Sequence, residues 1–146
     1  MGNRFMGTIS FFNEGIGFEL KGKRVLRKWV QEVLEKEGAT PGDINFIFCG
    51  DETLHAINQE YLGHDTLTDI VTFDLGEDEN ITADIYVSIE RVKENARELG
   101  VPFREELHRV MIHGILHLLG YEDKSPTARK KMRIREDECL KLLENK

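Results

Sequence analysis

The sequence has few of the features that mark secreted or membrane proteins. Only 2 cysteines occur in 146 residues, Cys49 and Cys139, so the disulfide framework of a small secreted domain is not expected. No apolar run approaches the roughly 18–20 residues that a membrane-spanning helix needs, and residues 1–15 lack the apolar core and cleavage site of a secretory signal. These absences predict one domain over residues 1–146, working in a reducing cytoplasm without a membrane partner.

The charge of the chain is unevenly distributed. The formal net charge of −7 at pH 7, taken alone, argues against a nucleic-acid partner. However, the segment 124–135, KSPTARKKMRIR, contains six basic residues and no acid. Such a run is usually a solvated helix face, but beside a site for phosphate chemistry it would gather RNA phosphates.

Hydrophobic periodicity and turn residues predict strands and helices in mixed order. The expected strands are 7–12, 16–20, 44–49, 68–75 and 81–89. The expected helices are 23–37, 51–62, 89–99, a fourth from Pro102 to Gly120, and a last one that follows Ser125-Pro126. This order predicts an α/β or α+β fold, with one mixed sheet of about four strands covered by helices.

Residues 110–119 are apolar apart from two histidines, His113 and His117. Their spacing of four places both imidazoles on the same face of a helix that should be buried. A buried imidazole needs a partner, and a hydrogen bond to a nearby carbonyl would suffice for each. Gly120 then ends the helix in a conformation that lets the chain fold back, and Asp123 returns a third donor atom toward the histidine pair.

The pattern H-x-x-x-H-x-x-G-x-x-D offers two imidazole nitrogens and one carboxylate oxygen, with a fourth position left for water. This is the coordination of catalytic zinc, although Fe(II) would also accept it. We therefore expect one divalent metal ion, Zn²⁺ by preference, on His113, His117 and Asp123. Zinc would polarise a phosphoryl or carbonyl oxygen and acidify a bound water. Zinc peptidases of the H-E-x-x-H type carry a glutamate base where this chain has Gly114, which disfavours peptide hydrolysis.

Over residues 44–124 the sequence resembles the YbeY-type endoribonucleases, also called ribosomal RNA maturation factors. The family's H-G-x-L-H-L-x-G-Y-D-H element is matched by HGILHLLGYED at 113–123, and its T-D-V-L-S-F strand by TDIVTF at 68–73. Its G-D-I strand is matched by ADIYVSI at 83–89, and its N-x-x-Y segment by residues 58–61. The resemblance implies a small zincin-like domain that cleaves RNA phosphodiester bonds with a metal ion. It also implies ribosomal RNA precursors and ribosomal components as partners.

Two departures from the family pattern affect the expected site. Asp123 replaces the family's third metal-binding histidine, which keeps the ligand count but subtracts one charge. Leu62 stands where an arginine usually follows the N-x-x-Y tyrosine, so phosphate positioning must come from elsewhere.

The remaining candidate site residues fall into three groups. The residues expected to line the substrate path are Thr68, Thr72, His64 and Arg109. The basic residues expected to contact RNA are Lys124, Arg129, Lys130 and Lys131. The candidates for proton transfer are Glu122 and Asp69. A strand-end cap is the structural alternative for Asp69, and simple β propensity is the alternative for the threonines.

Two other functions remain open. One is a metallopeptidase or another hydrolase on a zincin scaffold, against which Gly114 counts. The other is a non-catalytic ribosome-assembly protein in which the metal only tightens the end of the helix, and Leu62 favours this reading.

Overall fold

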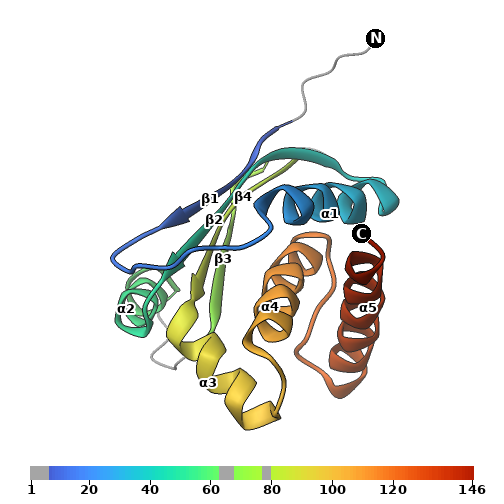
Figure 1. Ribbon diagram of the computed structural model, residues 1–146. Coiled ribbons are helices and arrows are strands. Elements are labelled where there is room, and N and C mark those ends of the chain that lie inside the picture. Colours follow the sequence, from blue (N-terminus) through green and yellow to red (C-terminus); the bar gives the residue numbers. More distant parts are fainter. Residues whose placement is uncertain (1–6, 63–67, 77–79) are drawn as a thin grey trace.

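The computed structural model describes residues 7–62, 68–76 and 80–146. Within these ranges the chain forms a four-stranded sheet and five helices (Figure 1). In chain order the elements are β1 (Ile9–Asn13), α1 (Lys23–Lys36), β2 (Thr40–Cys49), α2 (Asp51–Leu62), β3 (Ile70–Asp74), β4 (Asn80–Ser88), α3 (Ile89–Leu99), α4 (Phe103–Leu118) and α5 (Pro126–Glu144). Within the same ranges, no helix combines the length and the apolar content needed to cross a bilayer.

The sheet is mixed, as the sequence predicts. Its strand order is β1-β2-β4-β3. β1, β2 and β4 run parallel, with Ile44 of β2 paired to Ile9 on one side and to Ala83 on the other. β3 pairs antiparallel with β4 and lies at the edge, where Ile70 is opposite Val87. This edge position leaves the beginning of β3 beside the helices that carry the candidate site.

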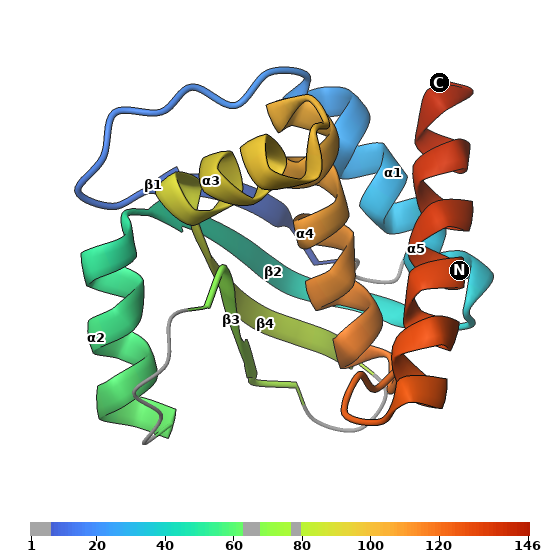
Figure 2. The same ribbon diagram turned by 90° about the horizontal axis from the view of Figure 1, so that it is seen from below.

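One face of the sheet carries the main core. Side chains such as Phe46 and Ile85 from the strands form one buried cluster with Trp29 of α1 and Met111 of α4. Figure 2 shows α1, α3 and α4 on this side, with α5 outside them. α5 is tied to the core because the Trp29 indole Nε1 donates a 2.7 Å hydrogen bond to the Cys139 carbonyl oxygen. α4 is therefore a central helix, as its apolar sequence predicts.

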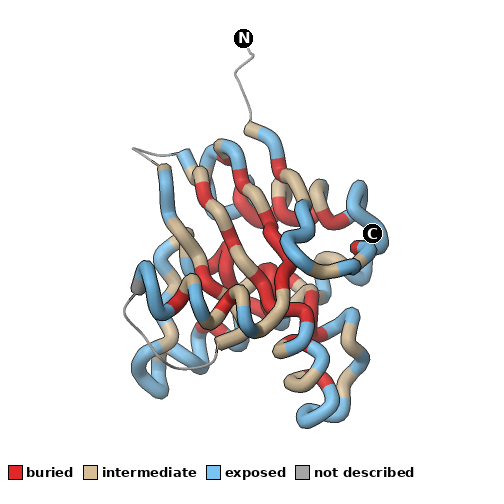
Figure 3. The backbone as a smooth tube through the Cα atoms, turned by 90° about the vertical axis from the view of Figure 1, so that its left-hand side faces the viewer, coloured by how far each residue is buried: buried red, intermediate tan, exposed pale blue. Residues whose placement is uncertain are grey.

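The opposite face is covered in part by α2. Leu54 of α2 forms a small buried cluster with Cys49 and Val71 from the strands. Figure 3 views the molecule from this side and shows buried and half-buried residues along the strands. Successive side chains of a strand point to opposite faces of the sheet, so β2, β3 and β4 contribute residues both to this cluster and to the main core.

The prediction of a strand at residues 16–20 is wrong. A turn does occur at Gly15, whose φ is 70°, but β1 pairs in parallel with β2 instead of forming a hairpin with the residues that follow. Residues 16–20 run without regular structure. Phe18 packs edge-on against Phe48 and Phe103, so the apolar character of this segment reflects burial against the core.

Candidate active site

The site is organised around α4, which lies close to the sheet at Gly114. A Cβ added at Gly114 would lie 2.8 Å from Ile70 Cδ1, 3.3 Å from Ile85 Cγ2 and 3.4 Å from Thr72 Oγ1. Glycine at this position therefore allows the helix to approach β3 and β4. Gly114 therefore has a packing role in addition to lacking a side chain that could transfer a proton. The close approach places His113 near the beginning of β3.

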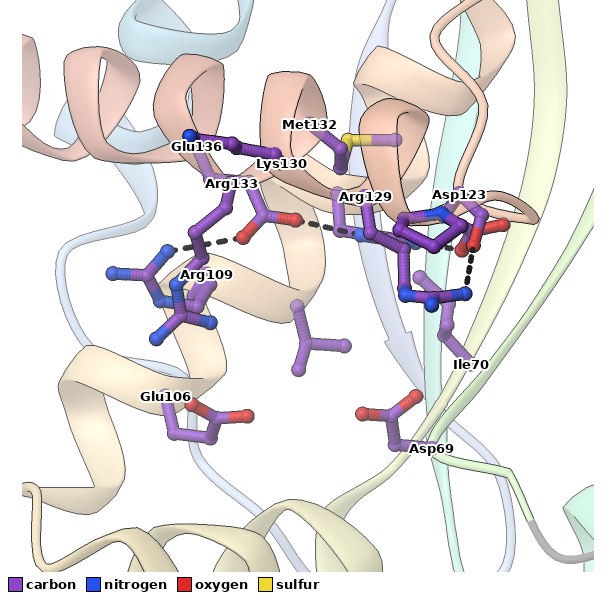
Figure 4. Close-up of a pocket in the computed structure, with 13 residues that line it drawn as sticks. Asp69, Ile70, Glu106, Arg109, Asp123, Arg129, Lys130, Met132, Arg133 and Glu136 are labelled. Atoms are coloured by element: carbon purple, nitrogen blue, oxygen red, sulfur yellow. Dashed lines mark hydrogen bonds and ion pairs between the residues drawn. The ribbon is translucent and has the colours of Figure 1, made fainter.

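A pocket of about 600 Å³ opens between α4, α5 and the beginning of β3 (Figure 4). Its lining combines acids with bases. The acidic residues of the lining are Asp69, Glu106, Asp123 and Glu136. The basic residues of the lining are Arg109, His113, Arg129, Lys130 and Arg133. Such a mixture can hold a cation at one point and phosphate groups at others.

His113 is held between two carboxylates. Its Nδ1 lies 2.6 Å from Glu136 Oε2 of α5, and its Nε2 lies 3.2 Å from Asp123 Oδ2. Burial acts to lower the pKa of His113, but the hydrogen bond and charge of Glu136, aided by Asp123 and Asp69, outweigh burial and raise the pKa. The sequence prediction that Asp123 returns to His113 is consistent with this contact.

The return of Asp123 depends on the end of α4. Gly120 has a φ of 104°, its N–H donates to the His117 carbonyl oxygen, and the Tyr121 N–H donates to the Leu116 carbonyl oxygen. These two bonds form a Schellman motif, which reverses the chain at a glycine. The three residues after Gly120 then bring Asp123 back toward His113. A local signal in the sequence thus explains a contact across ten residues.

His117 lies one turn further along α4 and is exposed. Among the described residues, no three or more His, Cys, Asp or Glu side chains are grouped as the ligands of one metal ion. The donor chemistry still suits a divalent metal, because His113 Nε2 and an Asp123 oxygen already lie together. The second ring nitrogen of His113 meets a buried carboxylate, as in many metal-binding histidines. His113 and Asp123 could therefore supply two ligands to a metal, whereas the third predicted ligand, His117, is not grouped with them in the part of the chain that the structure describes.

Two carboxyl groups face one another in the pocket. Figure 4 shows Asp69, at the beginning of β3, pointing toward Glu106 of α4. Burial raises the pKa of Asp69, although His113 opposes the rise, and Asn95 Nδ2 donates to Asp69 Oδ2 at 3.2 Å. Burial also raises the pKa of Glu106, and the charge of Asp69 adds to the rise. Carboxyl groups with raised pKa values are suited to accept and return protons.

Glu106 and Glu136 were not among the sequence candidates. Both are buried, at 7% and 4% exposure. Glu106 lies seven residues before His113, hence on the same helix face, which is a signal that the sequence contained. Glu136 lies on the inward face of α5 with Met132 and Cys139. An acid within an otherwise apolar stripe was the available signal for it.

The predicted substrate-lining residues have different surroundings. Arg109 lines the pocket, but its guanidinium is already paired with two carboxylates of α5. The Thr68 hydroxyl donates to the Ile70 carbonyl oxygen at 3.2 Å, whereas Thr72 lies on β3 where α4 approaches at Gly114. His64 lies outside the described residues.

Only some of the predicted RNA-contacting and proton-transferring residues lie at the pocket. Arg129 and Lys130 line the pocket, together with Arg133, which is not among the residues predicted to contact RNA. Lys124, Lys131 and Glu122 are exposed. One turn of α5 thus supplies three cations to the pocket.

Comparisons with known proteins agree with this architecture. The family model described as Endoribonuclease YbeY matches residues 12–144. A protein named Endoribonuclease YbeY from Flavobacterium psychrophilum is 53% identical over 131 residues, which cover 90% of this chain and 94% of the relative. One of the same name from Porphyromonas gingivalis is 42% identical over 139 residues, covering 95% and 92%. The solution structure of TM1509 from Thermotoga maritima is 34% identical, with a TM-score of 0.64 and coverage of 94% and 92%.

Proposed function

Because the chain belongs to the YbeY endoribonuclease family, we propose that it is a metal-dependent endoribonuclease that cleaves RNA phosphodiester bonds in ribosomal RNA maturation. The observation that carries the proposal is the meeting of His113 Nε2 and Asp123 Oδ2 at 3.2 Å, in a pocket lined by Arg129, Lys130 and Arg133. The pocket thus combines donor atoms for a cation with groups that attract phosphate. Ribosomal components as partners and a cytoplasmic location belong to the same proposal.

We assign the metal to His113, His117 and Asp123, with Zn²⁺ as the preferred ion. When bound, such an ion supplies Lewis-acid polarisation of a phosphate oxygen. The aspartate leaves one positive charge less at the site than a third neutral histidine would. The positive charge that is missing must then come from the surrounding basic residues when an anionic substrate binds.

The protein's own groups have separate tasks in this proposal. Asp69 and Glu106 accept and return the protons exchanged during cleavage, since burial raises the pKa of each carboxyl. Arg129, Lys130 and Arg133 bind backbone phosphates on either side of the cleaved bond. They take the place of the arginine that Leu62 replaces.

The two rival functions are less well supported. A peptidase of the H-E-x-x-H type needs a glutamate at position 114, where even a Cβ would lie 2.8 Å from Ile70 Cδ1. A purely structural metal in a ribosome-assembly protein gives no reason for a half-buried and a buried carboxyl group, Asp69 and Glu106, that face one another in a pocket. Ribosome association without nuclease activity would nevertheless favour that rival.

The test compares wild-type protein with His117→Ala and with Glu98→Gln, an exposed substitution on α3. Zinc content and cleavage of a ribosomal RNA precursor are measured, each with and without a chelator. We expect wild type and Glu98→Gln to bind about one zinc and to cleave, and His117→Ala to lose both properties. Equal cleavage by His117→Ala and wild type would refute the proposal.

The phosphate contacts have their own test. Arg129→Ala should reduce the dependence of RNA affinity on salt concentration by about one counterion, because each phosphate contact releases about one. Arg97→Ala on α3, also exposed, is the control and should leave the slope unchanged. An unchanged slope in Arg129→Ala would remove this residue from the interface.

A further inference from the structure

A chain of polar contacts runs from the surface of α5 to the proposed metal ligand. Arg109 Nη2 donates to Asp137 Oδ1 at 2.8 Å, and Arg109 Nη1 donates to Glu136 Oε1 at 3.0 Å. The other oxygen of Glu136 lies 2.6 Å from His113 Nδ1, and His113 Nε2 faces Asp123 at 3.2 Å. The Glu136 side chain is only 5% exposed and that of Arg109 only 13%. Water therefore competes little for the contact between Arg109 and Glu136.

From this geometry we infer that Glu136, itself fixed by Arg109, is a positioning residue that sets the ring orientation and the tautomer of His113. The inference rests on the proposed function, in which His113 is a metal ligand. A carboxylate can only accept hydrogen bonds, so Glu136 requires a proton on His113 Nδ1. The lone pair of the neutral ring is then on Nε2, the nitrogen that faces Asp123.

The orientation of Glu136 is as constrained as that of His113. Arg109 has no acceptor atom, so it fixes Oε1 and leaves Oε2 for the histidine. Two helices contribute to the arrangement, because Arg109 and His113 lie one turn apart on α4 and Glu136 lies opposite them on α5. Carboxylates that hold the second nitrogen of a metal-binding histidine fix its tautomer and raise its basicity as a ligand.

A simpler reading is that Arg109 and Glu136 only fasten α5 to α4. That reading requires the arginine–carboxylate contact alone and is indifferent to which nitrogen of His113 carries the proton. The two readings therefore differ in a property of the imidazole that does not depend on the stability of the fold.

The decisive variant is Glu136→Gln, which preserves shape and removes the charge. Because Arg109 can only donate, the amide oxygen of Gln must face Arg109 and the amide NH₂ must face His113. His113 Nδ1 then has to accept, so its proton moves to Nε2 and blocks the lone pair that a metal needs. Asp137→Asn is the matched control, since Asp137 also accepts from Arg109, from the next position of α5, and has no contact with His113 in the structure described.

Two measurements on the full-length chain test the inference. The first is zinc affinity, measured by competition with a chromophoric chelator, where Glu136→Gln should bind about 10–100-fold more weakly than wild type and Asp137→Asn should not. The second is the long-range ¹H–¹⁵N spectrum of His113 in metal-free protein, at a pH where the ring is neutral. It should show the Nδ1–H tautomer in wild type and in Asp137→Asn, and the Nε2–H tautomer in Glu136→Gln.

The outcomes separate the inference from the proposed function. Equal zinc affinity and an equal tautomer in Glu136→Gln and wild type would overturn the inference and leave the proposed function intact. Wild-type protein without zinc affinity would refute the proposed metal site, and the tautomers would still decide whether Glu136 orients His113. If Glu136→Gln fails to fold, an Nε2–H tautomer in wild type would by itself overturn the inference.

Discussion

Replacing Arg109 by Met should destabilise the protein by about 3 kcal/mol. The substitution leaves the Glu136 carboxylate, at 5% exposure, without the guanidinium that donates to it at 3.0 Å. Removing one partner of a buried ion pair costs roughly 3–5 kcal/mol, because the remaining charge stays buried and uncompensated. We expect the lower end of that range, since His113 Nδ1 still contacts Glu136 at 2.6 Å. In a domain of this size the loss corresponds to roughly 6–12 °C in Tm.

Urea unfolding followed by tryptophan fluorescence measures this loss. The only tryptophan, Trp29, is fully buried and hydrogen-bonded to α5, so its emission reports on the docking of that helix. The control is Arg97→Met, which removes an ion pair whose side chains are 71% and 40% exposed and should cost no more than about 0.5 kcal/mol.

A double variant checks the cause of the loss. Arg109→Met with Glu136→Gln has no stranded charge and should recover more than half of the lost stability. If Arg109→Met unfolds within about 0.5 kcal/mol of wild type, the buried pair does not stabilise the contact between α4 and α5 and the reasoning is refuted.

Three further predictions concern packing, capping and pH. Gly114→Leu should lower the free energy of unfolding by about 2–3 kcal/mol, because its side chain would overlap Ile70; a variant as stable as wild type would contradict the packing role. Ser125→Ala should cost about 1 kcal/mol in urea unfolding, since it removes the 3.0 Å bond from the Ala128 N–H that caps α5, and no loss would mean that the cap is dispensable. Burial, aided by a nearby arginine, lowers the pKa of His108 to about 4, so the unfolded chain takes up this proton near pH 6.5 before the folded chain does. The contribution of neutral His108 to stability is therefore complete above pH 6.5, and the free energy of unfolding should fall by at most about 3 kcal/mol as pH drops from 6.5 to 4. If the free energy of unfolding of a His108→Gln variant falls equally with pH, the loss comes from other groups.

Much of the fold could be predicted because local sequence patterns indicate its helices and strands. The apolar stretch predicted at 110–119 is buried in α4 from 110 to 116 apart from the half-buried His113, but the expected burial is wrong for His117, which is exposed. The Ser125-Pro126 pair begins α5 with the expected cap. The beginning of β2 was placed four residues late, at 44 instead of Thr40. Proline and glycine at 41 and 42 are typical of a turn, but here they lie in a strand beside a register shift, which only the pairing with β4 reveals.

The site was predictable as far as local geometry reached. The glycine reversal at Gly120 needs only the residues around it, and it explains how Asp123 meets His113. The contact of Glu136 with His113 depends on how α5 docks on α4; the apolar residues on the same face of α5 indicate that Glu136 faces inward, but they do not identify its partner. The same limit applies to Glu106, whose burial follows from the packing of α4 near β3.

The docking of α5 has a consequence for the order in which a nascent chain acquires its properties. The mixed sheet and α4 are complete in sequence by Leu118, and α5 is the last element to be translated. The partner of His113 at position 136 is translated later. A chain interrupted between these two points would carry His113 without the carboxylate that orients it, and without Met132 and Cys139, which α5 adds to the core.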